Sequence, residues 1–367
     1  MAARSAWAAV PTVVWRLSAV LLVLAAAASA CGDADDGEST SSTESGVDAA
    51  PVADDGDTDV DRPDTTLPVD ADDTGGGGDG IAMKSFTDDM GRTVDVPVEP
   101  QRIVAINEFS HAEPLLALGA PLIGMTDQGG GEFNPPTAAA YDVSGVTSIG
   151  GFETLNVETI LELEPDLILG YSFSGEWFNN VDVEVLQEIA PTVALDENKP
   201  RDEFHRQVAD LVGYAEEFES QREAYFARIE ALAPDVPEGL SIVSLCCYFD
   251  GNVSALTTAN PNPTSAIIFD LGIPMPPIAD STDIYNSISE ESILDDDFLA
   301  DVILIEERGA DIGDLALLWD QVPAVAAGQS HVVSMAAGTS YLHSMVILDE
   351  IEPYIIGADA GVVSESP

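Results

Sequence analysis

The chain has 367 residues, of which 46% are hydrophobic, and this is enough for two domains with their own cores. It carries 66 acidic residues against 12 lysines and arginines, for a net charge of −54 at pH 7. Such a surface repels nucleic acid and anionic lipid headgroups, which argues against both as partners. Adaptation to salt is the simplest cause of the acidity, and a cationic partner is the alternative.

Residues 1–30 are predicted to be a secretion signal. Arg4 and Arg16 supply positive charge, residues 13–28 are mostly apolar, and Ala28, Ser29 and Ala30 precede Cys31. Small residues before a cysteine resemble a bacterial lipoprotein signal, although Ala28 stands where that pattern prefers leucine. The resemblance implies lipid on Cys31 and a protein anchored to the cell membrane on its outer side. A retained anchor helix is the alternative, but the apolar run is short for a membrane span.

Residues 31–80 are predicted to be a disordered acidic tether. The segment is rich in Asp, Ser, Thr and Gly, and it holds 16 acids with Arg62 as its only base. The remaining 50 acids lie in residues 81–367 against 9 of the 12 bases, so the folded part itself carries a net charge of −41. The acidity is therefore not confined to the tether.

Residues 81–212 are predicted to form an N-terminal α/β lobe. Apolar runs alternate with helical patterns, which favours a mostly parallel sheet. We expect a hairpin over 86–97 that turns at Met90–Gly91, strands at 102–106, 121–125, 166–169 and 191–194, and helices at 114–119, 157–163 and 183–189. A Gly-rich loop is expected at 127–136 and an aromatic loop at 171–178.

A long amphipathic stretch over 201–233 follows the first lobe. Apolar side chains recur at three- and four-residue steps, and prolines stand just before and just after the stretch. Gly213 either kinks one helix or ends a first helix and starts a second, and we favour the second interpretation. The connecting helix is therefore placed at 213–235. A helical connection resists bending, so we expect small closing motions.

Residues 236–367 are predicted to form a C-terminal α/β lobe with the same alternation. Strands are expected at 241–249, 301–305 and 331–333, and helices at 265–271, 290–295, 315–319 and 342–356. The predicted fold is therefore an α/β protein with two lobes, each with a central and mostly parallel sheet. A long backbone helix joins the lobes, and a ligand cleft lies between them.

Two segments repeat one pattern across the connecting helix. LNVETILELEPDLILG (155–170) and ISEESILDDDFLADVILIEE (288–307) each combine a Glu near a helix start, an Ile-Leu pair, and an Asp before an apolar strand. The repeat places Glu158 opposite Glu291. A chance match between two helix–strand units is the alternative.

The chain resembles the substrate-binding proteins of bacterial ABC importers for iron–siderophores, haem and cobalamin. The resemblance spans residues 86–356 and is carried by DDMGRTVDVPVEPQRIVAI, EPLLALGAPLIGM, NVETILELEPDLILG and DLALLWDQVPAV. It implies two lobes on a long helix, a ligand between them, a permease and its ATPase as partners, and a protein that is monomeric. One Glu on each lobe docks onto the permease in this family. The matching residues are Glu158 and Glu291, and Glu290 is adjacent to the second. The alternative for both is an ordinary solvent-exposed acid at a helix start, where the helix dipole favours negative charge.

Aromatic side chains gather on the loops that follow the predicted strands, where open α/β sheets bind ligands. They suit a bulky chelate or macrocycle, although several are expected to pack inward. Arg308 is the one base on a cleft loop, and it meets either a ligand oxygen or Glu306 and Glu307. A single arginine favours a weakly charged chelate such as a ferric hydroxamate. The predicted ligand-binding residues are Phe109, Phe133, Tyr171, Trp177, Phe178, Tyr248 and Arg308.

No resident cofactor, metal site or enzyme activity is predicted. The four histidines have no metal-binding spacing, and buried thiols are favoured for Cys246 and Cys247 over an adjacent disulfide or a site for a soft ion. GYSFSG (170–175) lacks the second glycine of a hydrolase nucleophile elbow. The sequence therefore predicts a lipid-anchored binding protein of an ABC importer, with a ferric siderophore as ligand. The alternatives are haem or cobalamin binding, and a surface lipoprotein that binds without transport.

Overall fold

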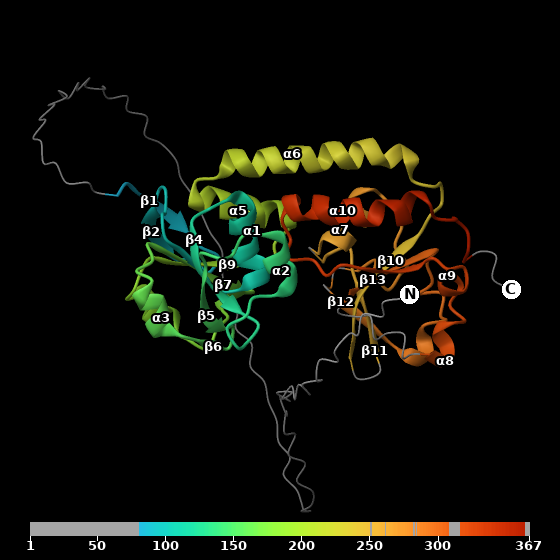
Figure 1. Cartoon of the computed structure of the whole chain (residues 1–367), viewed down its shortest axis with the longest axis horizontal. Coiled ribbons are helices and arrows are strands. Elements are labelled where there is room, and N and C mark those ends of the chain that lie inside the picture. Colours follow the sequence, from blue (N-terminus) through green and yellow to red (C-terminus); the bar gives the residue numbers. More distant parts are fainter. Residues whose placement is uncertain are drawn as a thin grey trace, which may run out of the picture. The chain divides into compact units, whose positions relative to one another are not determined.

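The computed structural model describes residues 81–249, 252–260, 262–281, 283, 285–307 and 316–363, without the side chains of 247–249, 290, 316 and 317. The predicted signal peptide, tether, Cys31 and Arg308 lie outside the described residues. The described chain forms an α/β structure of two lobes under a long helix (Figure 1). This confirms the predicted fold class, while the exact domain boundaries remain a prediction.

The N-terminal lobe is built on a seven-stranded sheet whose centre is parallel. Ile103, Val104 and Ala105 are fully buried, as expected for a strand covered on both faces. A separate hairpin, β1 (Met83–Thr87) and β2 (Thr93–Pro97), precedes the sheet. The sheet strands are β3 (Ile103–Ala105), β4 (Leu122–Asp127), β5 (Thr147–Gly151), β6 (Thr154–Leu155), β7 (Leu167–Phe173), β8 (Glu176–Trp177) and β9 (Thr192–Asp196). The lobe's helices are η1 (Glu108–Ala112), α1 (Glu113–Leu118), α2 (Pro135–Ala140), α3 (Val157–Glu162) and α4 (Val183–Gln187).

Two segments of this lobe that were not predicted as helix or strand are ordered elements. The aromatic loop at 171–178 is a hairpin of β7 and β8, which turns at Ser174 (φ 53°) and Gly175 (φ 80°). The loop before α1 contains the π-helix η1, because the Asn107 side chain accepts hydrogen bonds from its first amides. Neither the hairpin nor the π-helix can be predicted from hydrophobic periodicity.

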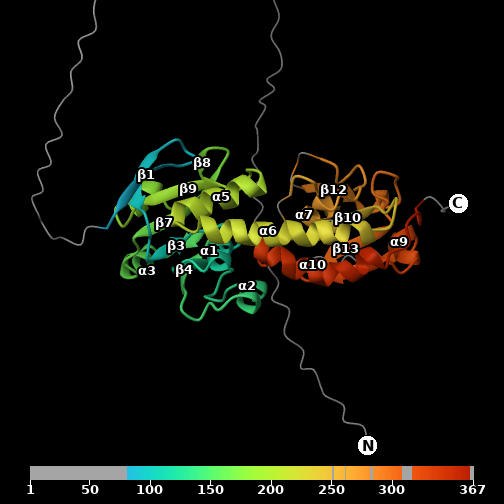
Figure 2. The ribbon, with the colours of Figure 1, turned by 90° about the horizontal axis from the view of Figure 1, so that it is seen from above.

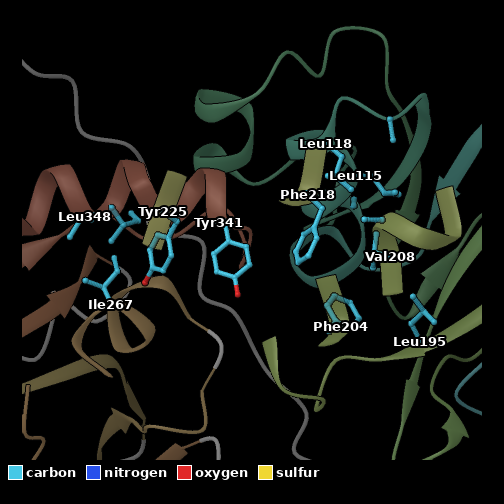
Figure 3. Close-up of a cluster of buried hydrophobic side chains, with 14 of the residues drawn as sticks. Leu115, Leu118, Leu195, Phe204, Val208, Phe218, Tyr225, Ile267, Tyr341 and Leu348 are labelled. Atoms are coloured by element: carbon cyan, nitrogen blue, oxygen red, sulfur yellow. The ribbon is translucent and has the colours of Figure 1, made fainter. Parts of the chain in front are cut away.

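Residues 201–233 form two helices, as we favoured. Helix α5 (Arg201–Val212) ends at Gly213, whose left-handed backbone (φ 84°) closes it, and α6 (Ala215–Leu232) begins two residues later. A short turn, η2 (Ala233–Asp235), follows. Helix α6 runs along both lobes (Figure 2) and packs against α5 and α10 (Tyr341–Ile356). The buried apolar side chains under it form one cluster that continues from one lobe into the other (Figure 3).

The C-terminal lobe contains a mixed five-stranded sheet. Strands β10, β13 and β14 are parallel, whereas β11 and β12 pair antiparallel at one side. The sheet strands are β10 (Ile242–Phe249), β11 (Asn252–Leu256), β12 (Tyr285–Ser289), β13 (Val302–Glu306) and β14 (Ser330–Val333). The remaining helices are α7 (Pro263–Asp270), η3 (Glu290–Ser292), α8 (Ala316–Trp319) and α9 (Pro323–Ala326).

Three expectations for this lobe are wrong in detail. Strands β11 and β12 were not predicted, because both are short and polar residues interrupt them. The helix expected at 290–295 is only the single turn η3. Cys246 is buried and disulfide-bonded, so the expected free thiol is wrong at this position. No helix within the described ranges is both long and apolar enough to cross a membrane.

Candidate functional site

A cavity of about 270 Å³ lies between the two lobes. The N-terminal lobe contributes residues that follow β3 and β9, and the C-terminal lobe contributes residues that follow β11 and β14. Strands β3, β9 and β14 run parallel in their sheets, and carboxyl ends of such strands are where open α/β sheets bind ligands, whereas β11 is antiparallel. The lining residues are Asn107, Phe109, Ser110, Glu197, Asn260, Asn262, Tyr285, Met335, Ala336, Gly338 and Thr339.

The turn after β3 holds the first wall of the cavity in a strained conformation. Asn107 has a φ of 134°, which is rare for a residue with a side chain. Its Oδ1 accepts hydrogen bonds from the amides of Phe109 (3.0 Å) and Ser110 (3.2 Å). These bonds fix the start of η1, and Phe109 is thereby held at the cavity wall.

His111 ties this wall to strand β9. Its Nδ1 lies 2.8 Å from Ser110 Oγ, and its Nε2 lies 3.2 Å from the Leu195 carbonyl oxygen. Burial lowers the pKa of His111, although the carboxylate of Glu197 acts against that shift. The imidazole is therefore neutral at pH 7, and it positions the cavity wall without adding charge.

Glu197 directly follows β9 and is half-buried in the cavity wall. Burial, together with the nearby carboxylate of Glu197, raises the pKa of Tyr171. Tyr171 packs edge-on against His111, with their ring centroids 5.6 Å apart. Glu197 is thus a half-buried carboxylate in the cavity wall, close to a buried tyrosine.

The opposite wall is built from two asparagines before α7. Asn262 Nδ2 donates to Glu306 Oε1 (2.5 Å), and Asn262 Oδ1 accepts from the Thr264 amide (2.9 Å). Asn260 Oδ1 in turn accepts from the Asn262 amide (2.9 Å). Both side chains are held by these bonds, so the wall is polar and preorganised.

The segment between β14 and α10 forms the rest of the cavity and joins the lobes. Glu113 of α1 is fully buried and accepts hydrogen bonds from the amides of Thr339 and Ser340, each at 3.0 Å, and from Ser340 Oγ at 2.6 Å. Arg201 of α5 donates to the Thr339 carbonyl oxygen (3.0 Å) and to Ser344 Oγ (2.6 Å). The cavity is therefore bounded by fixed contacts between lobes.

The predicted ligand-binding residues do not all reach this cavity. Phe109 lines it, and Tyr171 lies directly behind Glu197. Phe178 is 50% exposed and packs 5.3 Å from Tyr171, at the edge of an aromatic cluster. Phe133 is half-buried against the main core.

The other three predicted ligand-binding residues are placed differently. Trp177 packs over Gly170, and its Nε1 donates to the Val181 carbonyl oxygen (2.7 Å), so its ring belongs to the lobe interior. The backbone of Tyr248 lies in β10, and its side chain is outside the description, as is the whole of Arg308. Their roles stay predictions.

The two predicted docking residues are both exposed. Glu158 is the second residue of α3, and Glu291 lies in η3. Helix α3 is followed by β7, which pairs with β3, the first strand of the N-terminal sheet. The turn η3 is followed by β13, which pairs with β10, the first strand of the C-terminal sheet. The two glutamates therefore occupy matching topological positions, as the repeat predicted.

Glu197, Asn260, Asn262 and Tyr285 were not predicted as site residues. Glu197 follows a predicted strand end, so the rule used for the other loops would have found it. Tyr285 had no signal, because β12 itself was not predicted. Within the described residues, no group of three or more His, Cys, Asp or Glu side chains is arranged to hold a metal ion.

Residues 103–332 match a family described as periplasmic binding protein. Two curated relatives come from Bacillus subtilis (strain 168). The "Probable siderophore-binding lipoprotein YfiY" is 36% identical over 106 residues, which is 28% of this chain and 30% of that protein. The "Iron(3+)-hydroxamate-binding protein YxeB" is 32% identical over 116 residues, which is 32% of this chain and 31% of that protein. The matched stretches thus span about a third of these relatives.

Among solved structures, the FhuD protein from S. pseudintermedius shares the fold. The TM-score is 0.59 at 21% sequence identity, and the superposition covers 75% of this chain and 98% of the other. The likeness extends over both lobes, because the superposition covers 75% of this chain.

Proposed function

Since the chain belongs to the periplasmic binding protein family, we propose that it is the lipid-anchored substrate-binding component of an ABC importer and that it captures a ferric siderophore. The cavity between the lobes carries this proposal, because residues from four strand ends converge there. A family of binding proteins agrees with the prediction of a protein that is not an enzyme.

The chemistry of the cavity favours a ferric hydroxamate over a catecholate complex. A tris-catecholate complex is highly anionic, whereas a tris-hydroxamate complex is neutral at its metal centre. The described lining residues offer amide, hydroxyl, aromatic and carboxylate groups, and none of them is a lysine or arginine. The name of the relative YxeB, an iron(3+)-hydroxamate-binding protein, supports the same class. In this proposal, Arg308 contacts hydroxamate oxygens from its loop after β13.

A panel of ligands tests this assignment. Purified protein is titrated with ferric tris-hydroxamate, ferric tris-catecholate, haem and cobalamin complexes, and tryptophan fluorescence and native mass spectrometry report binding. We expect the hydroxamate complex to bind at micromolar concentration or below. Tighter binding of haem or cobalamin would reassign the ligand, and no binding by any of the four would overturn the siderophore proposal.

Transport requires docking onto a permease, and we assign this contact to Glu158 and Glu291. The double variant Glu158→Ala/Glu291→Ala should abolish uptake in cells and leave ligand affinity unchanged. The exposed pair Glu162→Ala/Glu184→Ala removes the same charge from helices of the N-terminal lobe and should retain uptake. Normal uptake by the first double variant would contradict docking through these residues.

The predicted anchor is tested separately. Cys31→Ser should release the protein from the membrane fraction into the medium, because the lipid has no other attachment point in this proposal. Retention of the variant in the membrane fraction would favour the alternative of a retained anchor helix.

A further inference from the structure

The charge of the cavity limits the ligand further. Among the described lining residues, Glu197 is the only one that carries a charge. No ion pair with an arginine, lysine or histidine is found for its carboxylate in the described part of the chain, and its neighbour His111 is buried and neutral. Among the described residues, no base therefore balances the negative charge of Glu197, and the proposed function assigns Arg308 to the hydroxamate oxygens of the chelate and not to Glu197.

The bases closest in sequence do not change this balance. Lys199 lies 2.6 Å from Asp89 and 2.7 Å from Gln207 Oε1. Arg201 is held by carbonyl oxygens and by Ser344, with Asp270 at 3.7 Å. Both line a neighbouring cavity that also holds Asp202 and Asp270, so that cavity adds no net positive charge.

A second layer of acidic residues surrounds the site. Glu306 is fully buried behind Asn262. A further cavity, which shares Met335 with the first, is lined by Glu307 and Glu350. The carboxylates of Glu307 and Glu350 add negative charge near the cleft.

Aromatic rings complete a site suited to a cation. Phe109 and Tyr285 line the same cavity as Glu197. The faces of aromatic rings attract ammonium groups, and a nearby carboxylate strengthens that attraction. A single carboxylate beside aromatic rings suits an organic cation, whereas a bare metal ion requires three or four converging ligands.

We propose that the ligand carries a positive charge, such as an ammonium group on a ferric chelate, and that Glu197 is the residue that selects it. This inference rests on the proposed function, since it takes the cavity between the lobes as the ligand site. Glu197 distinguishes cationic ligands from neutral and anionic ligands of the same shape.

A matched series of ligands tests the inference. The probes are ferric complexes of a linear trihydroxamate with a free terminal amine, of its N-acetyl derivative and of its N-succinyl derivative. They are cationic, neutral and anionic, and they share one metal centre. Binding is measured by tryptophan quenching at low salt and again at about 1 M NaCl, where screening acts within about 3 Å.

We expect the cationic complex to bind about tenfold more tightly than the neutral one, and the anionic complex to bind most weakly. Glu197→Gln should remove most of the difference between the cationic and neutral complexes. Glu203→Gln, which removes an exposed charge outside the cavity lining, should keep it. The melting temperature of each variant reports whether it folds.

The outcomes separate the two proposals. Equal affinity for all three complexes, tightest binding of the anionic one, or a preference that survives in Glu197→Gln would overturn the charge selection and leave the proposed function standing. Failure of all three complexes to bind would overturn both.

Discussion

Glu113 is the residue that most directly couples the two lobes. Its buried carboxylate accepts four hydrogen bonds, from Tyr141, from two backbone amides at the start of α10 and from Ser340 Oγ. Gly338 lies so close that any Cβ there would collide with the Glu113 side chain. The close contact with Glu113 therefore requires glycine at position 338.

Glu113→Ala should lower the free energy of unfolding by about 3 kcal/mol, because it leaves buried donors without a partner. Urea denaturation measures the loss. Glu113→Gln should cost less, since it keeps the size and one acceptor. The exposed Glu162→Ala serves as the control and should change stability by no more than about 0.5 kcal/mol. A Glu113→Ala variant as stable as this control would contradict the cross-lobe role.

His205 makes stability depend on pH. Burial, with the charge of Arg201 adding to it, lowers the pKa of His205 to about 3, against about 6.5 in an unfolded chain. Between these values the unfolded chain binds more protons, so the stabilisation present above pH 6.5 is lost as pH falls toward 3. The loss from this residue is about 2 kcal/mol at pH 5.

His205→Gln tests this dependence, because an amide can still hydrogen-bond to Thr339 Oγ1 but does not titrate. Urea denaturation at about pH 7.5 and pH 5 should show a smaller loss of stability in the variant than in the wild type. The raised pKa values of Glu108 and Asp270 affect both proteins alike and cancel in the comparison. An equal loss in both proteins would exclude His205 as the source.

At the scale of elements, Gly213 determines where α5 ends. Its φ of 84° favours glycine, and an added Cβ would lie 3.2 Å from the Val98 carbonyl oxygen. Gly213→Ala should therefore cost between about 1 and 2 kcal/mol in urea denaturation. Gly239→Ala is the matched control, with φ 80° and nothing within 4 Å of the added Cβ, and it should cost less. A Gly213→Ala variant more stable than the wild type would favour one continuous helix.

The elements that could be predicted from the sequence are those with strong hydrophobic patterns. The buried runs 103–105 and 302–306 and the helices on either side of Gly213 were predicted, because their apolar spacing and their terminal glycines or prolines mark them. Strands β11 and β12 were missed, since pairing across the sheet and not local sequence determines them. In the site, Phe109 was predicted from its loop, whereas the inward position of Trp177 depends on the absent Cβ of Gly170.

At the scale of the whole molecule, the net charge of −41 in residues 81–367 should make stability depend on salt. Raising NaCl from about 0.1 M to about 1 M shortens the screening length from about 10 Å to about 3 Å and weakens the repulsion between acids. The melting temperature should rise by several degrees, equivalent to about 2 kcal/mol. A triple variant, Glu216→Gln/Glu223→Gln/Glu230→Gln on exposed positions of α6, should show a smaller rise. A melting temperature that does not rise with salt would contradict adaptation to salt as the cause of the acidity.

The shared core predicts how far the lobes can move when a ligand binds. Phe218 and Tyr225 of α6 pack against Tyr341 of α10, with ring centroids 5.8 and 5.2 Å apart, and the Arg201 guanidinium lies 4.1 Å from the Tyr341 ring centroid. A wide closing motion would break this cluster and the Glu113 contacts. The free energy lost would have to come from tighter binding of the ligand to the closed form than to the open form.

We therefore expect crystal structures with and without ligand to differ by a rotation of a few degrees between lobes, and the radius of gyration in solution to change little. Tyr341→Ala, which removes the central ring, should widen the difference between the two states. A rotation of tens of degrees in the wild-type protein would show that α6 and its core do not hold the lobes at a fixed angle.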